Sequence, residues 1–227
     1  MIRVTENFRK IQDLLATAAN DAGRPADQIR LLAVSKKKPV EAIVELAAAG
    51  QRDFGENFVQ EGLEKSAACG RDDLIWHFIG RLQSNKTKVV AGHFHWVHTI
   101  ERLKIAHRLS AQRPIGAPDL NVCIEVNIDA EESKSGLRPD AVAALAREIV
   151  QLPRLRLRGL MCLPRIRATF EEQRKPFAAL RELLESLNNE GFCLDTLSMG
   201  MTADYAAAIC EGATIVRIGT ALFGARQ

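Results

Sequence analysis

One lysine follows an apolar run and is the residue of this sequence most suited to covalent chemistry. Lys36 comes directly after Leu32-Ala33-Val34-Ser35, and side-chain alternation puts Leu32, Val34 and Lys36 on one face of an extended segment. Burial and nearby cations lower the pKa of a lysine, and the neutral amine can then form a Schiff base. The alternative is a solvated charge run, because Lys37 and Lys38 follow at once.

Two later segments combine small residues with hydroxyl groups. Ser198 and Gly200 lie in SMGMT, and Gly219 and Thr220 lie in RIGTA. Hydroxyl groups together with backbone N–H groups that glycine leaves accessible are typical of phosphate sites. We expect these segments to hold an anion, and the alternative is a pair of ordinary tight turns.

An arginine and an asparagine complete the candidate residues. Arg217 stands two residues before Gly219 and therefore shares its strand face. An inward arginine needs an anion or an acceptor because it keeps its charge, and a structural ion pair with Glu125 or Asp195 is the alternative. Asn57 could hydrogen-bond a ligand or cap the helix that follows it.

Other motifs are weaker. His93, His95 and His98 are close in sequence, but no carboxylate or cysteine stands at ligand spacing, so we predict no metal site. His77 lies in an apolar segment and is expected in the core or at the mouth of the fold. The five cysteines form no Cys-x-x-Cys pair, which favours reduced thiols and a cytoplasmic protein.

Apolar periodicity predicts the elements that position these residues. A helix is expected over 2–22, where apolar residues recur at helical spacing. Eight strands then alternate with helical patterns. The strands are expected at Ile29–Ser35, Arg52–Gly55, Ile75–Gly80, Trp96–Ile100, Leu120–Ile128, Leu155–Leu163, Leu194–Met199 and Thr214–Gly219. The helices are expected at Val40–Ala49, Asn57–Ala68, Asn85–Ala91, Leu103–Gln112, Ala141–Gln151, Glu171–Asn189 and Tyr205–Glu211.

This order predicts an α/β fold, a (β/α)₈ TIM barrel with an extra N-terminal helix. The 227 residues suit one barrel domain spanning 1–227. An open doubly wound sheet is the alternative, but it usually carries a glycine-rich loop where this sequence has Ser35 to Pro39. In a barrel, the loops at the C-terminal ends of the strands carry the site, which is where Lys36 and both small-residue segments fall.

Composition excludes several classes of function. The formal net charge is +3, with both signs interspersed and with one tyrosine and two tryptophans. A nucleic-acid interface needs a basic stripe with aromatic side chains for stacking, so we expect none. We also expect no membrane contact, because no apolar run approaches the length of a bilayer-spanning helix and the N-terminus lacks a signal sequence.

Lys36, the two segments expected to hold an anion and Arg217 together match a known family. It resembles the pyridoxal phosphate homeostasis proteins, single-domain relatives of the alanine racemase barrel domain. Segments in order along nearly the whole chain carry the resemblance: LLAVSKKKP (31–39), FGENFVQE (54–61), WHFIGRLQSNK (76–86), VNIDAEESKSG (126–136), LRLRGLMCLP (155–164), LSMGMTADYAAAI (197–209) and VRIGTALFGAR (216–226).

The resemblance implies an alanine-racemase-like barrel that binds pyridoxal 5'-phosphate. It implies a Schiff base between the cofactor and Lys36, and a phosphate group held by Ser198, Gly219, Thr220 and nearby backbone N–H groups. It also implies that Arg217 faces the pyridine nitrogen. In such a site Lys36 is the one candidate catalytic residue.

The resemblance also places Asn57 close to the cofactor ring, and it leaves the activity open. One hypothesis is a monomeric binding protein that buffers pyridoxal phosphate or delivers it to cofactor-free enzymes, with little or no turnover. Another is a small amino-acid racemase, which needs an acid–base group on each face of the substrate carbon. In the two-domain racemases a tyrosine from a further domain of a partner subunit supplies the second group, and the only tyrosine here is Tyr205. A third hypothesis is a Schiff-base aldolase that needs no cofactor.

Overall fold

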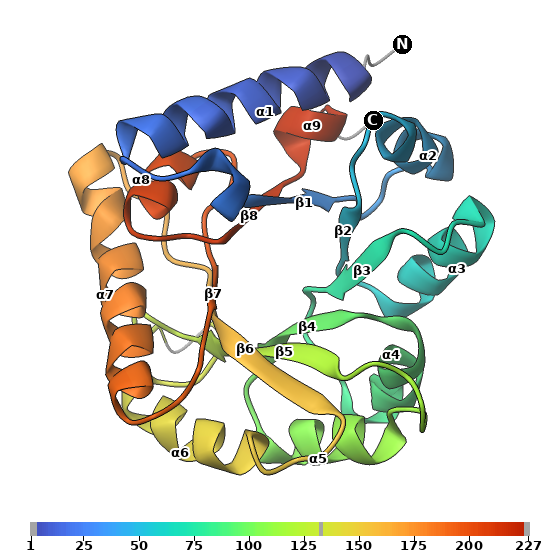
Figure 1. The fold of residues 1–227 in the computed structure, drawn as a ribbon, viewed down its shortest axis with the longest axis vertical. Coiled ribbons are helices and arrows are strands. Elements are labelled where there is room, and N and C mark those ends of the chain that lie inside the picture. Colours follow the sequence, from blue (N-terminus) through green and yellow to red (C-terminus); the bar gives the residue numbers. More distant parts are fainter. Residues whose placement is uncertain (1–3, 132–133, 225–227) are drawn as a thin grey trace.

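Eight parallel strands pair in chain order and close into a barrel, because β8 pairs with β1 (Figure 1). The computed structural model describes residues 4–131 and 134–224. The strands are β1 (Arg30–Val34), β2 (Asp53–Glu56), β3 (Ile75–Phe78), β4 (Trp96–Ile100), β5 (Leu120–Val126), β6 (Leu155–Cys162), β7 (Thr196–Ser198) and β8 (Ile215–Ile218). The expected (β/α)₈ barrel is confirmed, and the open-sheet alternative is wrong.

The helices surround the barrel (Figure 1). They are α1 (Val4–Asp21), α2 (Val40–Ala48), α3 (Val59–Cys69), α4 (Thr87–His93), α5 (Leu103–Gln112), α6 (Pro139–Ile149), α7 (Phe170–Asn189), α8 (Tyr205–Cys210) and α9 (Thr220–Phe223). Short 3₁₀ turns precede β1 (Ala26–Gln28) and α4 (Ser84–Lys86). The expected N-terminal helix is present as α1. It packs against α8, α9 and α2, outside the β8–β1 pairing.

Two apolar clusters follow from the alternation of strand side chains. The larger one fills the space between the outer face of the barrel and the helices. The smaller one lies inside the barrel and joins residues from five strands: Leu32, Trp96, Cys123, Met161 and Ile215. The interior is therefore a packed core rather than a pore, as in other barrels of this class.

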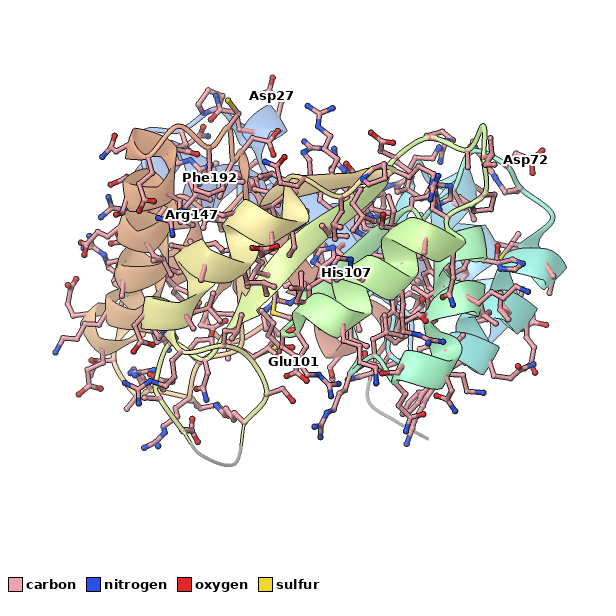
Figure 2. The ribbon with its side chains drawn as sticks, turned by 90° about the horizontal axis from the view of Figure 1, so that it is seen from below. Asp27, Asp72, Glu101, His107, Arg147 and Phe192 are labelled. Carbon is pink, nitrogen blue, oxygen red and sulfur yellow. The ribbon has the colours of Figure 1, made fainter. Side chains whose placement is uncertain are left out.

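The two ends of the barrel differ in the segments that form them. Figure 2 shows the molecule from the side, with Asp27, before β1, at one end and Glu101, after β4, at the other. The C-terminal ends of all the parallel strands lie on the Glu101 side, so every loop that the sequence marks for chemistry opens there. No helix among residues 4–131 and 134–224 is long and apolar enough to cross a bilayer.

Candidate functional site

Lys36 lies at the mouth of the barrel, in the turn that follows β1. Leu32 belongs to the interior cluster, and the pairing of β1 with β2 continues to Ser35, whose N–H donates to Gly55 O (3.0 Å). Alternation from Leu32 therefore turns Lys36 inward. The side chain is half-buried, and its amine makes no hydrogen bond or ion pair to any residue that the structure describes.

The turn that carries Lys36 is tightly constrained. Lys38 N donates to Ser35 O (3.0 Å), which closes a turn around Lys36 and Lys37. Lys37 has a φ of 58°, a conformation that side chains with a Cβ seldom adopt. Glu61 of α3 accepts the N–H of Lys37. The backbone of Lys37 is therefore fixed in the turn, so Lys36, Lys37 and Lys38 are not three equivalent residues of a solvated run.

A buried ion cluster lies on the outer side of the same turn. Lys65 of α3 pairs with Glu56 (2.8 Å) and Glu61 (2.7 Å), and it also donates to Ser35 O (2.6 Å). Ser35 Oγ donates to Glu56 Oε1 (2.7 Å). Burial raises the pKa of Glu56, while its bonds to Lys65 and Ser35 oppose that shift. The backbone on both sides of Lys36 is therefore bound to α3 or to the end of β2.

Asn57 points to the barrel mouth and does not cap α3. The residue that precedes α3 is Phe58, and it makes no side-chain cap, so the capping alternative is wrong. Gly55 faces the interior, because a Cβ there would lie 3.3 Å from Leu32, and Asn57 follows it by two residues. Asn57 Oδ1 is buried and has no hydrogen-bond partner among the described residues. This buried acceptor is open to a donor on a bound ligand or to a water.

Arg217 lies inside the barrel and is almost fully buried. It stands level with Leu32 in the register of β8 with β1. Its guanidinium donates to Ser198 Oγ (2.7 Å) and to Cys162 O (2.8 Å), and burial lowers its pKa. Asp195, one of the partners considered from the sequence, instead pairs with Arg158 (2.7 Å). No ion pair of Arg217 is found within the described part of the chain.

Ser198 lies deeper than the loops around it. It is fully buried on β7, and its Oγ lies 2.8 Å from His98 Nδ1 as well as accepting from Arg217. The structure therefore brings Ser198 and Arg217 together inside the barrel. The phosphate role of the Ser198 hydroxyl stays a prediction.

The other phosphate-loop residues lie at the barrel mouth. Gly219 is the residue before α9, and a Cβ there would lie 3.2 Å from Val34 O, so this loop touches the end of β1. Thr220 begins α9 and is exposed. Gly200 has a φ of 88°, and a Cβ there would lie 2.6 Å from Ala208 Cβ. Only glycine fits that position without a shift of α8.

One backbone donor in the first loop is already occupied. Met201 N donates to Asp204 Oδ1 (2.6 Å), and burial raises the pKa of Asp204. An anion at this mouth would therefore rely on the other N–H groups of the two loops and on the Thr220 hydroxyl.

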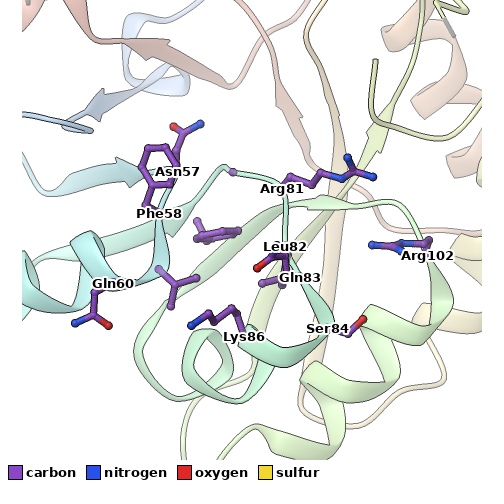
Figure 3. A pocket seen from close by; sticks show the side chains of 12 residues that line it. Asn57, Phe58, Gln60, Arg81, Leu82, Gln83, Ser84, Lys86 and Arg102 are labelled. Carbon is purple, nitrogen blue, oxygen red and sulfur yellow. The ribbon is translucent and has the colours of Figure 1, made fainter. Parts of the chain in front are cut away.

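Two cavities border the mouth. One, of about 360 Å³, lies at the ends of β5 and β6 and is lined by Glu125, Lys134 and Met201 among others. Burial, with the nearby Glu101 carboxylate, raises the pKa of Glu125 to about 7. A groove of about 740 Å³ lies at the ends of β2, β3 and β4, and Figure 3 shows Asn57 and Phe58 across from Arg81 and Arg102.

The three histidines close in sequence do not converge. His93 is exposed and bonds to Val89 O (2.9 Å), while His95 Nδ1 accepts from Trp76 N (3.0 Å). His98 lies inside the barrel, where its Nε2 lies 2.9 Å from His77 Nδ1. Among the residues that the structure describes, no three His, Cys, Asp or Glu side chains could hold a metal ion.

Comparison with known proteins identifies the family. The family model described as "Alanine racemase, N-terminal domain" matches residues 4–227. A curated pyridoxal phosphate homeostasis protein from Pseudomonas aeruginosa is 56% identical over 227 residues, which cover 100% of this chain and 97% of that protein. The chain belongs to the pyridoxal phosphate homeostasis protein family. The member from Escherichia coli strain K12 is 48% identical over 99% of this chain and 97% of its own.

Solved structures agree with this membership in the pyridoxal phosphate homeostasis protein family. PipY of Synechococcus elongatus, in a structure with pyridoxal phosphate bound, is 34% identical with a TM-score of 0.83, covering 98% of this chain and 100% of PipY. An alanine racemase from Clostridium difficile is 15% identical with a TM-score of 0.74, covering 95% of this chain and 56% of the racemase. This second likeness shows the fold alone. The resemblance inferred from the sequence is confirmed.

Sequence reasoning missed the supports of the site in this family member. Glu61 and Lys65 stand at helical i,i+4 spacing, which predicts an ion pair, but their attachment to the Lys36 turn depends on how α3 packs. His77 and His98 could have been found as a pair, because each occupies an interior position of its own strand, and β3 and β4 are neighbours. No pattern in the sequence singled out Asp204.

Proposed function

We propose that this protein holds pyridoxal 5'-phosphate as a Schiff base on Lys36 and buffers or delivers the cofactor, with little or no enzymatic turnover. The observation that carries the proposal is the inward position of the Lys36 amine at the barrel mouth, without a protein partner among the described residues. Membership in a family whose curated members are named for pyridoxal phosphate homeostasis and the cofactor-bound PipY structure support it.

The residues at the mouth fit the cofactor. Asn57 Oδ1 is an orphaned acceptor that a donor on the ligand or a water would satisfy. Gly219 has no Cβ, so its backbone can lie close to the end of β1 and to Val34. We assign Lys36 to the covalent bond, and Gly200, Gly219 and Thr220 to the phosphate. Pyridoxal phosphate supplies an aldehyde for the lysine and an electron-withdrawing ring.

Arg217 favours storage over catalysis. A guanidinium donates and never accepts, so when it faces the pyridine nitrogen it leaves that nitrogen unprotonated. The ring withdraws electrons best when this nitrogen carries a proton. Arg217, when it faces the pyridine nitrogen, therefore also weakens the cofactor as a catalyst.

The racemase alternative rests on the position of Tyr205. This tyrosine begins α8, as expected from the sequence, and its Cα would lie 3.2 Å from a Cβ placed on Gly200. It is therefore close to a loop of the proposed site. Solvent deuterium that enters Cα of an added amino acid, and that both Lys36→Ala and Tyr205→Phe abolish, would establish this second function.

Absorbance and chemical trapping test the covalent bond. Purified protein with added pyridoxal phosphate should be yellow, and borohydride should fix the phosphopyridoxyl group on Lys36, as read by peptide mass. Lys36→Ala should abolish both signals. Lys37→Ala is the matched control, because alanine keeps a Cβ in the same turn. A modified position 37 with an unmodified Lys36 contradicts the proposal, and a trapped sugar mass would indicate an aldolase.

Delivery is tested separately. Cofactor-free pyridoxal phosphate enzymes are the proposed partners, and the loaded protein should activate them faster than it releases the cofactor into buffer. Equal rates contradict delivery and leave buffering. A monomer in the cytoplasm is part of this proposal, since the candidate site is built from one chain and the described cysteines are all unpaired.

A further inference from the structure

A single chain of hydrogen bonds crosses the inside of the barrel and ends on Arg217. Arg217 Nη1 donates to Ser198 Oγ (2.7 Å), and Ser198 Oγ lies 2.8 Å from His98 Nδ1. His98 Nε2 lies 2.9 Å from His77 Nδ1, and His77 Nε2 lies 2.9 Å from Asp53 Oδ1. The chain links β8, β7, β4, β3 and β2.

The direction of every bond in this chain follows from its two ends. Asp53 is a carboxylate beside Arg30 (3.3 Å) and accepts, so His77 Nε2 carries a proton. A neutral His77 then accepts at Nδ1, which requires a proton on His98 Nε2. A neutral His98 in turn accepts at Nδ1, so the Ser198 hydroxyl donates to it. Ser198 Oγ is left to accept from Arg217, which is what the arginine needs.

Burial disfavours a positive charge on either histidine. They are fully buried, and burial lowers the pKa of each. His77 stacks on Trp96 at 5.4 Å. Asp53 favours the cation of His77, whereas Arg30 and His95 oppose it. His77, Arg217 and Arg30 oppose a cation on His98. A neutral pair gives the chain one arrangement of protons.

We propose that Ser198, His98, His77 and Asp53 are positioning residues that hold the Arg217 guanidinium toward the ring nitrogen of bound pyridoxal phosphate. The inference deepens the proposed function and rests on it. It also gives Ser198 a role other than phosphate binding, because its only proton goes to His98. Donation to a phosphate would leave a buried His98 nitrogen without its partner, which is unfavourable.

The arrangement of protons is testable without cofactor. In the unloaded protein labelled with ¹⁵N-histidine, NMR at neutral pH should show His77 and His98 as neutral rings with the proton on Nε2. His107→Gln, at an exposed position on α5, should leave both signals in place. A proton on Nδ1 of either ring, or a cation at neutral pH, overturns the proposal whether or not the protein binds the cofactor.

The effect on the cofactor is tested with ring-labelled ¹⁵N pyridoxal phosphate. In His98→Leu and in Ser198→Ala, the ring-nitrogen resonance should move toward that of a pyridine without a hydrogen-bond donor. Affinity should fall about 5- to 10-fold, the scale of one hydrogen bond. The double variant should resemble either single variant, because both break one chain. His98→Asn, which keeps an acceptor near Ser198, should restore part of the shift.

The outcomes separate this inference from the proposed function. If the parent protein forms no imine band, the proposed function fails, while the histidine spectra still report on the chain. If the imine forms but His98→Leu leaves the ring-nitrogen resonance unchanged in a folded protein, the positioning role fails. Additive losses of affinity for Ser198→Ala and His98→Leu would instead assign Ser198 to the phosphate.

Discussion

Lys65 Nζ donates to the carbonyl oxygen of Ser35 at 2.6 Å, directly before Lys36 in the chain. The bond ties α3 to the residue that precedes the candidate nucleophile. Glu61, one helical turn before Lys65, accepts the N–H of the residue that follows Lys36. Lys36 therefore sits between two backbone groups held by the same helix, which limits the directions its amine can take.

Loss of the Lys65 charge should destabilise the protein and loosen this turn. Lys65→Met leaves Glu56 buried without its cation, and removing one partner of a buried pair costs about 3–5 kcal/mol. Urea unfolding measures this loss, and the rate of imine formation with pyridoxal phosphate should fall as well. Lys88→Met, at an exposed position on α4, is the control. The double variant Glu56→Gln/Lys65→Met should recover part of the stability, and no recovery contradicts this account.

The loop after β7 should tolerate only glycine at position 200. Gly200→Ala places a Cβ 2.6 Å from that of Ala208 at a φ of 88°, so we expect a loss of about 1–3 kcal/mol in unfolding free energy. Cofactor affinity should fall with it. Gly92→Ala is the matched control, because nothing lies within 4 Å of its Cβ in α4; it should stabilise by up to about 1 kcal/mol. Equal effects of the two variants would contradict the prediction.

Stability should fall with rising pH because of Glu125. Its pKa is raised from 4.5 to about 7 in the folded protein, so the folded state binds the proton more tightly than the unfolded state. The stabilisation is present below about pH 4.5 and is lost as the pH rises through about 7.

Glu125→Gln should remove this pH dependence. Compared with the parent, the variant should gain about 2–3 kcal/mol between pH 5 and pH 8, since one pKa unit is worth about 1.4 kcal/mol. Denaturant curves of unloaded protein at the two pH values measure the gain. Glu64→Gln, on the surface of α3, should show none, and a pH-independent difference for Glu125→Gln counts against the raised pKa.

The Thr220 hydroxyl should contribute to cofactor retention. Thr220→Val keeps the shape of the side chain but removes a donor at the start of α9, and we expect a loss of about 1–2 kcal/mol, or about 5- to 30-fold in affinity for pyridoxal phosphate. Thr17→Val, at an exposed position on α1, is the control. The imine absorbance at saturation should not change, because Lys36 is intact, and an altered spectrum would argue for a role other than phosphate binding.

The barrel was predictable because β-rich apolar runs alternate with helical patterns along the chain. The inward face of Lys36 follows from side-chain alternation with Leu32 and stays a prediction. Boundaries were less exact: the helix expected from Asn57 begins at Val59, and the short final helix from Thr220 was not among the expected helices.

Long-range contacts could not be predicted from local patterns. The bond from Ser198 to His98 spans 100 positions, and the bond from Lys65 to Ser35 spans 30. Each depends on the register of the closed barrel or on the docking of a helix. The same holds for Arg217, for which an ion pair with Glu125 or Asp195 was the alternative. Asp195 is paired with Arg158, and the bonds of Arg217 go to a hydroxyl and a backbone carbonyl.

The pairing of β8 with β1 has a consequence for biosynthesis. Lys36 is translated early, whereas Arg217 and the Gly219 loop emerge about 180 residues later. They come next to the Lys36 turn only when β8 pairs with β1, in the register that sets Arg217 level with Leu32. For most of its synthesis the nascent chain therefore carries Lys36 without the rest of the candidate site. Under the proposed function, we expect the chain to retain pyridoxal phosphate only after β8 pairs with β1, so a yellow colour would mark chains that have finished folding.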